Sequence, residues 1–361
     1  MKTLETESKI ETFTGDLMGT QSMIDNIIVP PSAPDIPGLR FRGFRGEADY
    51  PNILAAINAS KGADQVERSD TLEAIANNYT HLTNCDPYQD MIFAEVNENV
   101  VGYGRVEWQL NDEGQWIGFH LAFLHPDFRR MGIGTAMLRY LEQRQRQIAD
   151  RLQAEGVITT DTPRFFETFA SDTETGREAL LQKEGYQGVR FEHFMSRPLS
   201  EPIEITPMPE GLEVRPVSPE QVRAIWDAAT EAFRDHWGFV EPSEAEYLRF
   251  LEDPITDPSL WMVGWDGDQV AGSVQNFLHR DENEEYQRKR GYTEGISVRR
   301  PYRKLGLATA LLTRSLQMFK DMGMEEAALG VDSQNLSGAF RLYERVGFRV
   351  YKRQTIYRKP L

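Results

Sequence analysis

The clearest periodic pattern along the chain is a stripe of apolar residues at the spacing of an α-helix. The stripe consists of Ala308, Leu312, Leu316 and Phe319. Residues at this spacing share one face of a helix, which can pack against a core. Gly323 follows the stripe, and glycine commonly ends helices. The pattern therefore predicts an amphipathic helix that ends near Gly323.

Shorter apolar runs precede this helix and predict strands. Residues 259–265 and 269–279 flank the sequence Asp-Gly-Asp, a strong signal for a β-hairpin, and residues 292–298 form a further strand. A similar series of runs occurs earlier in the chain, at residues 91–96, 100–108 and 116–124. The two series indicate that one structural unit occurs twice.

Three sequence matches support an internal repeat. They follow the same order in both copies, and the first copy contains an additional segment between its second and third matches. Two related modules are the simplest account. The matched pairs are GLRFRGF (38–44) with GLEVRPV (211–217), RRMGIG (129–134) with RKLGLA (303–308), and GYQGVRFEHFMSRPL (185–199) with GFRVYKRQTIYRKPL (347–361).

Each module is predicted to be an α/β unit, in which a mixed sheet is covered by helices and a β-hairpin closes the C-terminal end. We expect four segments along the chain. They are a loosely held N-terminal arm (1–36), a first module (37–199), a proline-containing linker (200–210) and a second module (211–361).

Composition narrows the class of protein. A chain of 361 residues can form two domains that each bury a core. No apolar run approaches the roughly 18 residues of a membrane span, and the N-terminus lacks the features of a secretory signal, so we expect a cytoplasmic protein that does not bind membranes. A single cysteine, Cys85, excludes an intramolecular disulfide and reads as a partly buried thiol in a reducing compartment.

Charge and histidine content exclude two further classes. The net charge of −16 argues against nucleic-acid binding, which needs a basic face. The six histidines and one cysteine are scattered without metal-ligand spacing, so we expect no metal.

One local stretch reverses the acidic balance of the chain. Arg299, Arg300, Arg303 and Lys304 come directly before Gly306 and the predicted helix. A glycine turn at a helix N-terminus presents free backbone N–H groups and the positive end of the helix dipole. The stretch therefore predicts a site for a phosphate-bearing ligand.

The identity of this ligand follows from the motif. A Walker A loop needs Gly-Lys-Ser/Thr, which neither copy has, and a dinucleotide fingerprint would need a small residue at Met137. The remaining pattern, Arg-x-x-Gly-x-Gly/Ala, resembles the signature of the GNAT acetyltransferase superfamily. Residues 330–348, in which an Asn precedes a helix carrying Leu-Tyr-Glu and ending at Gly-Phe, are similar to a later element of that superfamily.

The resemblance covers nearly the whole chain and implies two GNAT modules in tandem that use acetyl-CoA as co-substrate. It implies that Glu294 is the general base and Tyr343 the general acid that protonates the CoA sulfur. The alternatives are a solvated strand carboxylate for Glu294 and a core aromatic for Tyr343. A carboxylate among apolar strand residues should have a raised pKa, which suits a base.

The resemblance also implies a set of residues that contact CoA. Asn335 would help to hold the CoA chain, with a helix N-cap as its alternative role. Ile296 and Val298 would contribute backbone groups, while their side chains belong to the core. The implied residues in the second module are Ile296, Val298, Arg303, Lys304, Leu305, Gly306, Leu307, Ala308, Thr309 and Asn335, and those in the first are Arg129, Arg130, Gly132, Gly134 and Thr135.

The first copy departs from the family pattern. Alignment of the repeats places Leu181 opposite Tyr343, Thr173 opposite Asn335 and His120 opposite Glu294. Leucine cannot donate a proton, so we expect the first module to be non-catalytic, with CoA binding left open. His120 reads more readily as a core or cleft histidine than as a base.

The acceptor is expected to bind near residues 235–247. Asp235, His236, Trp237 and Phe239 would supply a carboxylate for an ammonium group and aromatic surface for the substrate body, unless the segment is only a packed corner between helices. The sequence thus predicts an N-acetyltransferase for a small-molecule or peptide amine, as a monomer or homodimer. The alternatives are a CoA-binding scaffold or regulatory protein and an acyltransferase for longer acyl groups or a hydroxyl acceptor.

Overall fold

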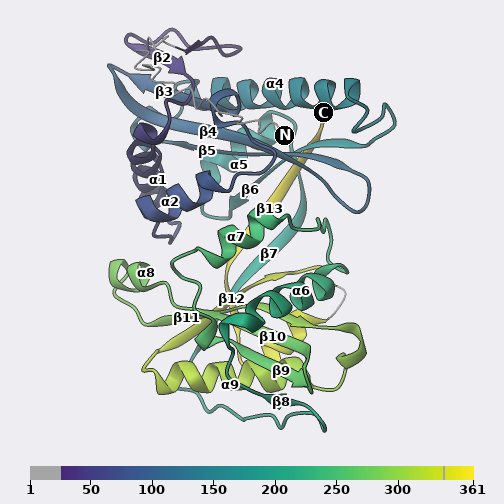
Figure 1. Ribbon diagram of the computed structural model, residues 1–361. Coiled ribbons are helices and arrows are strands. Elements are labelled where there is room, and N and C mark those ends of the chain that lie inside the picture. Colours follow the sequence, from purple (N-terminus) through teal and green to yellow (C-terminus); the bar gives the residue numbers. More distant parts are fainter. Residues whose placement is uncertain (1–25, 336–337) are drawn as a thin grey trace, which may run out of the picture.

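The computed structural model describes residues 26–335 and 338–361 of the chain. Within them, thirteen strands form one continuous sheet in the order β1-β2-β3-β4-β5-β6-β13-β7-β12-β11-β10-β9-β8. Helices cover both faces of the sheet in each half of the molecule (Figure 1). The predicted mixed α/β architecture is therefore confirmed.

The elements follow the repeat in the sequence. The first repeat contributes β1 (Ile27–Ile28), β2 (Leu39–Arg42), α1 (Tyr50–Asp64), α2 (Leu72–Thr80), α3 (Pro87–Asp90), β3 (Met91–Val96), β4 (Asn99–Leu110), β5 (Trp116–Leu124), α4 (Ile133–Ala154), β6 (Arg164–Ser171), α5 (Thr175–Lys183) and β7 (Gln187–Pro198). The second contributes β8 (Glu213–Val214), α6 (Val222–Phe233), α7 (Glu244–Leu251), β9 (Met262–Asp266), β10 (Gln269–Phe277), α8 (Arg280–Glu285), β11 (Arg290–Val298), α9 (Leu307–Asp321), β12 (Glu326–Asp332), α10 (Ala339–Arg345) and β13 (Arg349–Pro360).

The last strand of each repeat joins the other half of the molecule. Strand β7 pairs antiparallel with β12 of the second repeat, and β13 pairs antiparallel with β6 of the first, while β7 and β13 pair with each other. Figure 1 shows β13 running into the half that holds α4, where the C-terminus lies. The two repeats are thus joined by an exchange of strands at the centre of the sheet.

The predicted closing hairpins are wrong. Each segment forms one long strand, β7 or β13, instead of folding back on itself. Gly188 of β7 lies where an added Cβ would be only 2.9 Å from Thr355 of the neighbouring strand. Gly188 therefore permits close strand packing rather than a turn.

The exchanged strands carry core residues of the half that they enter. Met195 on β7 is buried with Phe319 of α9, and Tyr357 on β13 is buried with Leu181 of α5. Burial of such side chains is worth about 1.5–3 kcal/mol each, so each half depends on the strand that it receives.

Helices α4 and α1 cover opposite faces of the first half. Met137 and Leu141 of α4 pack in one core with Ile92, whereas Ile53 of α1 packs in another with Phe93. Ile92 and Phe93 are consecutive residues of β3, and consecutive side chains point to opposite faces of a sheet. In the second half α9 covers one face, with Leu311 against Val274, and α6 the other, with Ile225 against Val263.

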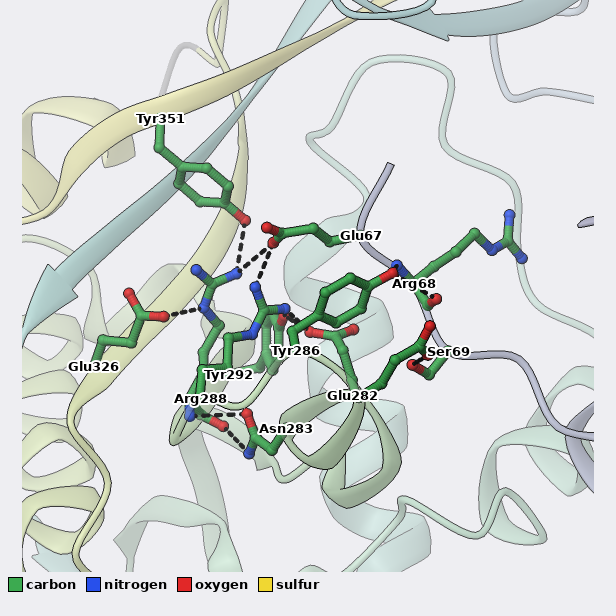
Figure 2. Close-up of polar contacts among 12 residues, drawn as sticks. Glu67, Arg68, Ser69, Glu282, Asn283, Tyr286, Arg288, Tyr292, Glu326 and Tyr351 are labelled. Atoms are coloured by element: carbon green, nitrogen blue, oxygen red, sulfur yellow. Dashed lines mark hydrogen bonds and ion pairs between the residues drawn. The ribbon is translucent and has the colours of Figure 1, made fainter. Parts of the chain in front are cut away.

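Polar contacts beside the sheet also join the two halves (Figure 2). Lys61 lies 2.5 Å from Glu285, and Glu67 forms ion pairs with Arg288 and Arg290. These contacts fix the segment after α1 against the α8–β11 region.

The segments expected to be an arm and a linker both pack against the modules. Strand β1 pairs with β2 at one edge of the sheet, and Ser32 accepts a hydrogen bond from Arg139 of α4 at 2.8 Å. Likewise, the Thr206 carbonyl accepts a hydrogen bond from Arg314 of α9 at 2.6 Å. The remainder of the predicted arm, residues 1–25, lies outside the described residues.

The exchange predicts that neither half folds alone. Residues 1–199 and 200–361, expressed separately, should show no cooperative thermal transition by circular dichroism, because each lacks a central strand and its buried side chains. Co-expression should restore a complex that melts near the temperature of the intact chain. A monomeric 200–361 fragment that melts cooperatively at that temperature would contradict this.

Candidate functional site

Both repeats build the same turn before a helix. Gly306 and Gly132 are the N-caps of α9 and α4, and each has φ of 90°. Lys304 and Arg130, two residues earlier, also have positive φ, at 64° and 62°. This left-handed geometry turns the backbone so that the first N–H groups of each helix face outward without acceptors in the helix.

The arginines of the second turn are used within the protein. Arg303 donates to Asp235 at 2.5 Å and to the Ala232 carbonyl at 3.1 Å, and Arg300 also pairs with Asp235. These hydrogen bonds hold the pKa of Asp235 well below its usual range. Asp235 therefore secures the turn to the end of α6.

The first turn has the same internal ion pair. Arg129 forms two hydrogen bonds to Asp64, at 2.6 and 2.8 Å, and donates a third to the Leu124 carbonyl at 3.1 Å. Much of the positive charge that the sequence assigned to an anionic ligand thus fixes the turn, and the backbone N–H groups are left to meet the ligand.

Next to each turn, two parallel strands separate. Strands β11 and β12 pair only over Arg290–Tyr292, and β5 and β6 only over Trp116–Phe119. After Tyr292 the two strands diverge, and the backbone N–H and C=O groups of residues 293–298 make no ladder hydrogen bonds to β12. The side chains of Ile296 and Val298 pack beside Leu307 and Leu311, as core residues do. The separation leaves room for an extended ligand chain between the strands.

A bulge sets the direction of Glu294. Ser273 pairs with Ser297, but Gln275 pairs with Glu294, so β11 has one residue more than β10 here. Gly295 adopts φ of 51° at this point. Gly291 faces Phe319 of α9, so Glu294, three residues later, points away from α9. Because of the extra residue, Ile296 packs beside α9 instead of sharing the face of Glu294.

Because of this bulge, His120 is not the structural counterpart of Glu294, although the sequence alignment places the two residues opposite each other. Strand β5 pairs with β4 without any register shift, and His120 faces the cavity beneath α4. Glu294 faces the opposite side of its sheet. The two residues are therefore not structural counterparts, and an ungapped alignment cannot reveal this.

The Glu294 carboxylate lies in an acidic, crowded environment that solvent still reaches. Desolvation by the surrounding protein raises the pKa of Glu294, and the charges of Glu192 and Glu282 raise it further. Glu282 itself is buried and accepts hydrogen bonds from Arg288 and Tyr292 (Figure 2). A carboxylate with a raised pKa is suited to accept a proton.

Tyr343 lies on α10 and is buried in the core that Phe348 and Leu316 share. Burial raises the pKa of its phenol, which stays protonated at neutral pH. The residue matches Leu181, because Phe348 N–H bonds to the Tyr343 carbonyl as Tyr186 N–H bonds to that of Leu181. Here the sequence alignment and the structure agree.

Asn335 is not a helix N-cap. The N-cap of α10 is Gly338, whose N–H lies 3.5 Å from the Asn335 carbonyl. Asn335 itself follows β12 in a turn closed by a hydrogen bond to the Asp332 carbonyl.

The first module contains a cavity of about 350 Å³ beside its turn. Arg130, Gly132 and Thr135 line it, together with His120 and Leu181. Burial lowers the pKa of His120 to about 3, so the ring is neutral, and neither ring nitrogen has a partner among the described residues. The cavity thus extends to the turn. The residue that corresponds to Tyr343 is Leu181, which cannot donate a proton.

A second cleft, of about 260 Å³, lies between the modules. His236 and Trp237 line it, whereas Asp235 is held at the turn. The indole of Trp237 lies against the guanidinium groups of Arg190 and Arg358, at 4.7 and 4.3 Å. Phe239 touches the first module through its carbonyl, which accepts from Asp112 N–H at 3.1 Å.

Three residues of this cleft were missed by the sequence reasoning. Arg190 and Glu192 come from β7, and Asp332 ends β12. The strand exchange brings β7 of the first repeat to the second site, and no motif in the sequence signals it.

Cys85 is half-buried, and burial raises the pKa of its thiol to about 12, so it is not a reactive thiolate. Among the described residues, no group of three or more His, Cys, Asp or Glu side chains is placed to hold a metal ion. None of the helices in residues 26–335 and 338–361 is long and apolar enough to cross a membrane.

Comparison with known proteins agrees with this geometry. The acetyltransferase (GNAT) family model matches residues 223–348, and an acetyltransferase (GNAT) domain model matches residues 87–187. The molecule is therefore an acetyltransferase. More specifically, the chain belongs to the GNAT family and carries two GNAT modules in tandem, as the resemblance implied.

Relatives share the tandem arrangement, which is similar to that of mycothiol synthase. The mycothiol acetyltransferase of Salinispora arenicola is 26% identical over 317 residues, covering 86% of this chain and 94% of its own. That of Geodermatophilus obscurus is 28% identical over 268 residues, covering 72% and 79%. A GCN5-related N-acetyltransferase from Sphaerobacter thermophilus has a TM-score of 0.65 and 26% identity, covering 91% and 97%.

The turn of α9 predicts a selective effect on CoA binding. Gly306→Glu should weaken acetyl-CoA binding by about 100-fold in isothermal titration calorimetry, because a carboxylate would face the phosphates. Gly323→Glu at the other end of α9 is the matched control, since Gly323 also has positive φ, at 81°. Both variants should lose about 1–2 kcal/mol of stability, but only Gly306→Glu should lose affinity. Equal affinities would refute this role of the turn.

Proposed function

We propose that this protein transfers an acetyl group from acetyl-CoA directly to a primary amine, with the chemistry in the second module. The observation that supports the proposal is that the second module holds both Glu294, on β11, and Tyr343, on α10, near the separated strands β11 and β12. The first module has the turn and the separated strands, but has Leu181 in place of Tyr343. At these two positions, the second module has a carboxylate that can accept a proton and a phenol that can donate one.

Each residue has one role in the proposed reaction. Glu294 accepts a proton from the amine, whose nitrogen then attacks the thioester carbon. The nitrogen of the tetrahedral intermediate releases its remaining extra proton to solvent. The intermediate then collapses, the carbon–sulfur bond breaks, and Tyr343 donates its proton to the departing thiolate. The products are an acetamide and CoA, and solvent restores the protonation of both side chains.

The proposed CoA contacts follow the turn and the separated strand. The N–H groups of residues 306–309 would bind the pyrophosphate, and the backbone of Ile296 and Val298 would bind the chain that leads to the thioester. Lys304 and Leu305 are exposed at the turn, where they would border the same ligand. Asn335, on the turn after β12, would contact the chain from the opposite side.

The acceptor would enter from the cleft between the modules. His236 and Trp237 border that cleft, and its carboxylates would attract an ammonium group. The relatives named above are mycothiol acetyltransferases, so mycothiol-related amines are the first acceptors to screen. Peptide N-termini are the second class to screen.

We propose that each repeat is one functional module. Residues 37–199 form a non-catalytic module and residues 211–361 the catalytic one, although each needs a strand from the other. The cavity beside Gly132 favours a second, unreactive CoA site in the first module. A protein that binds acetyl-CoA without releasing CoA to any amine, or that prefers a longer acyl-CoA, would support the scaffold or long-chain alternatives instead.

Removal of the proposed acid should slow turnover without weakening binding. Tyr343→Phe should lower kcat by about 100-fold and leave KM for acetyl-CoA within a few-fold, because the phenol acts only on the leaving thiolate. Tyr103→Phe, at a buried tyrosine of the first module, should keep the normal kcat. Unchanged turnover in Tyr343→Phe, measured by thiol release, would remove the acid from the mechanism.

The proposed base predicts a pH dependence with a defined sign. The charged form of Glu294 is the active one, so kcat/KM should fall as pH decreases through its raised pKa. Glu294→Gln should abolish this acidic limb and lower kcat/KM by about 10²–10⁴-fold. Glu285→Gln, on α8 and paired with Lys61, should retain the limb. A Glu294→Gln enzyme with a normal pH profile would exclude Glu294 as base.

A further inference from the structure

The exchanged strand β7 brings a second carboxylate, Glu192, to the proposed catalytic face. In the ladder with β12, Glu192 lies opposite Asp332. Leu329 and Val331 of β12 point into the core beside α9, so Gly330 and Asp332 point to the other face. Glu294 also points away from α9. Glu192, Asp332 and Glu294 therefore share one face, although they come from three strands and from both repeats.

Gly330 leaves the space between these strands open. It is exposed, and a Cβ added there would be only 3.1 Å from Glu192 Oε1. Any larger residue would fill the gap over β12, which lies between β11 and β7 in the sheet. A small ligand group can thus approach Glu192 and Glu294 together.

Glu192 differs from the neighbouring carboxylates Asp332 and Glu282 in its hydrogen-bond and ion-pair partners. Asp332 receives hydrogen bonds from Arg190, at 3.0 Å to each carboxylate oxygen, and Glu282 is paired with Arg288. In the described part of the chain, Glu192 receives a single side-chain hydrogen bond, from the neutral amide of Gln354 at 3.2 Å. Glu192 is therefore a part-buried carboxylate without a cationic partner.

Such a carboxylate favours the entry of a cation. Taking a carboxylate out of water without a counter-charge costs free energy, which an incoming ammonium group recovers. Desolvation and the charge of Asp332 raise the pKa of Glu192, and among nearby charges Glu192 has the largest effect on Glu294. The other charged or titratable groups facing the pair are Glu282 on α8, Asp332 on β12, Arg190 on β7 and His236 in the loop after α6, whose pKa burial lowers.

We infer that Glu192 binds the ammonium group of the acceptor beside Glu294, so that the second active site is completed by a strand of the first repeat. This inference rests on the proposed function. The ammonium donates one N–H to Glu192, and Glu294 removes a second proton. Glu192 keeps its charge throughout and also tunes the basicity of Glu294.

The test is a titration of the intact protein labelled with ¹³C at the glutamate carboxyl carbons. Glu294→Gln identifies the Glu294 resonance by its loss. In Glu192→Gln the pKa of Glu294 should fall by about one unit, because a like charge is removed. Glu167→Gln is the matched control, since Glu167 of β6 lines the same cleft but is paired with Arg358 at 2.6 Å. It should leave the Glu294 pKa unchanged.

Kinetics give the second readout, with the amine selected in the acceptor screen. Glu192→Gln should raise KM for that amine about tenfold, leave KM for acetyl-CoA unchanged, and move the acidic limb to lower pH. If Glu294→Gln removes the limb but Glu192→Gln changes neither the Glu294 pKa nor KM for the amine, the role of Glu192 is refuted and the proposed function stands. If Glu294→Gln retains the limb, the proposed base fails and the inference fails with it.

Discussion

The pairing of β7 with β12 and of β13 with β6 is the constraint on which the rest of the structure depends. Each strand satisfies backbone hydrogen bonds of the other repeat and fills its core. The separated parallel strands, the glycine turns and the cleft between the modules are all positioned relative to this central ladder. A protein built in this way cannot lose either repeat, because each repeat supplies a structural strand of the other half.

The two repeats share the geometry of the turn but differ in the residues around it. Both keep the left-handed turn, with Gly132 and Gly306 at the same φ, and both secure it by an internal arginine–aspartate pair. The differences lie at two positions. Leu181 stands where the second repeat has Tyr343, and the regular strand β5 lacks the bulge that follows Glu294 in β11. The two repeats therefore have the same architecture and differ here by two local changes.

Much of the architecture could be predicted from local patterns. The strands at 91–96 and 116–124 and the helix after Gly306 were expected nearly as observed, because periodicity and turn residues act locally. The exchange could not be predicted, since pairing between distant strands leaves no local signal. For the same reason the sequence led to Asp235 as an acceptor residue, although it is held by Arg303, and gave no indication of Glu192. One bulge residue, Gly295, was enough to make the alignment of His120 with Glu294 wrong.

The central claim is that acetyl transfer takes place in the second module, at a site that both repeats complete. A crystal structure of the protein with CoA and the preferred amine tests this most directly. The account predicts the CoA sulfur beside the Tyr343 hydroxyl and the amine nitrogen between the carboxylates of Glu294 and Glu192. Density for the amine in the cavity of the first module, beside His120 and Leu181, would contradict the account.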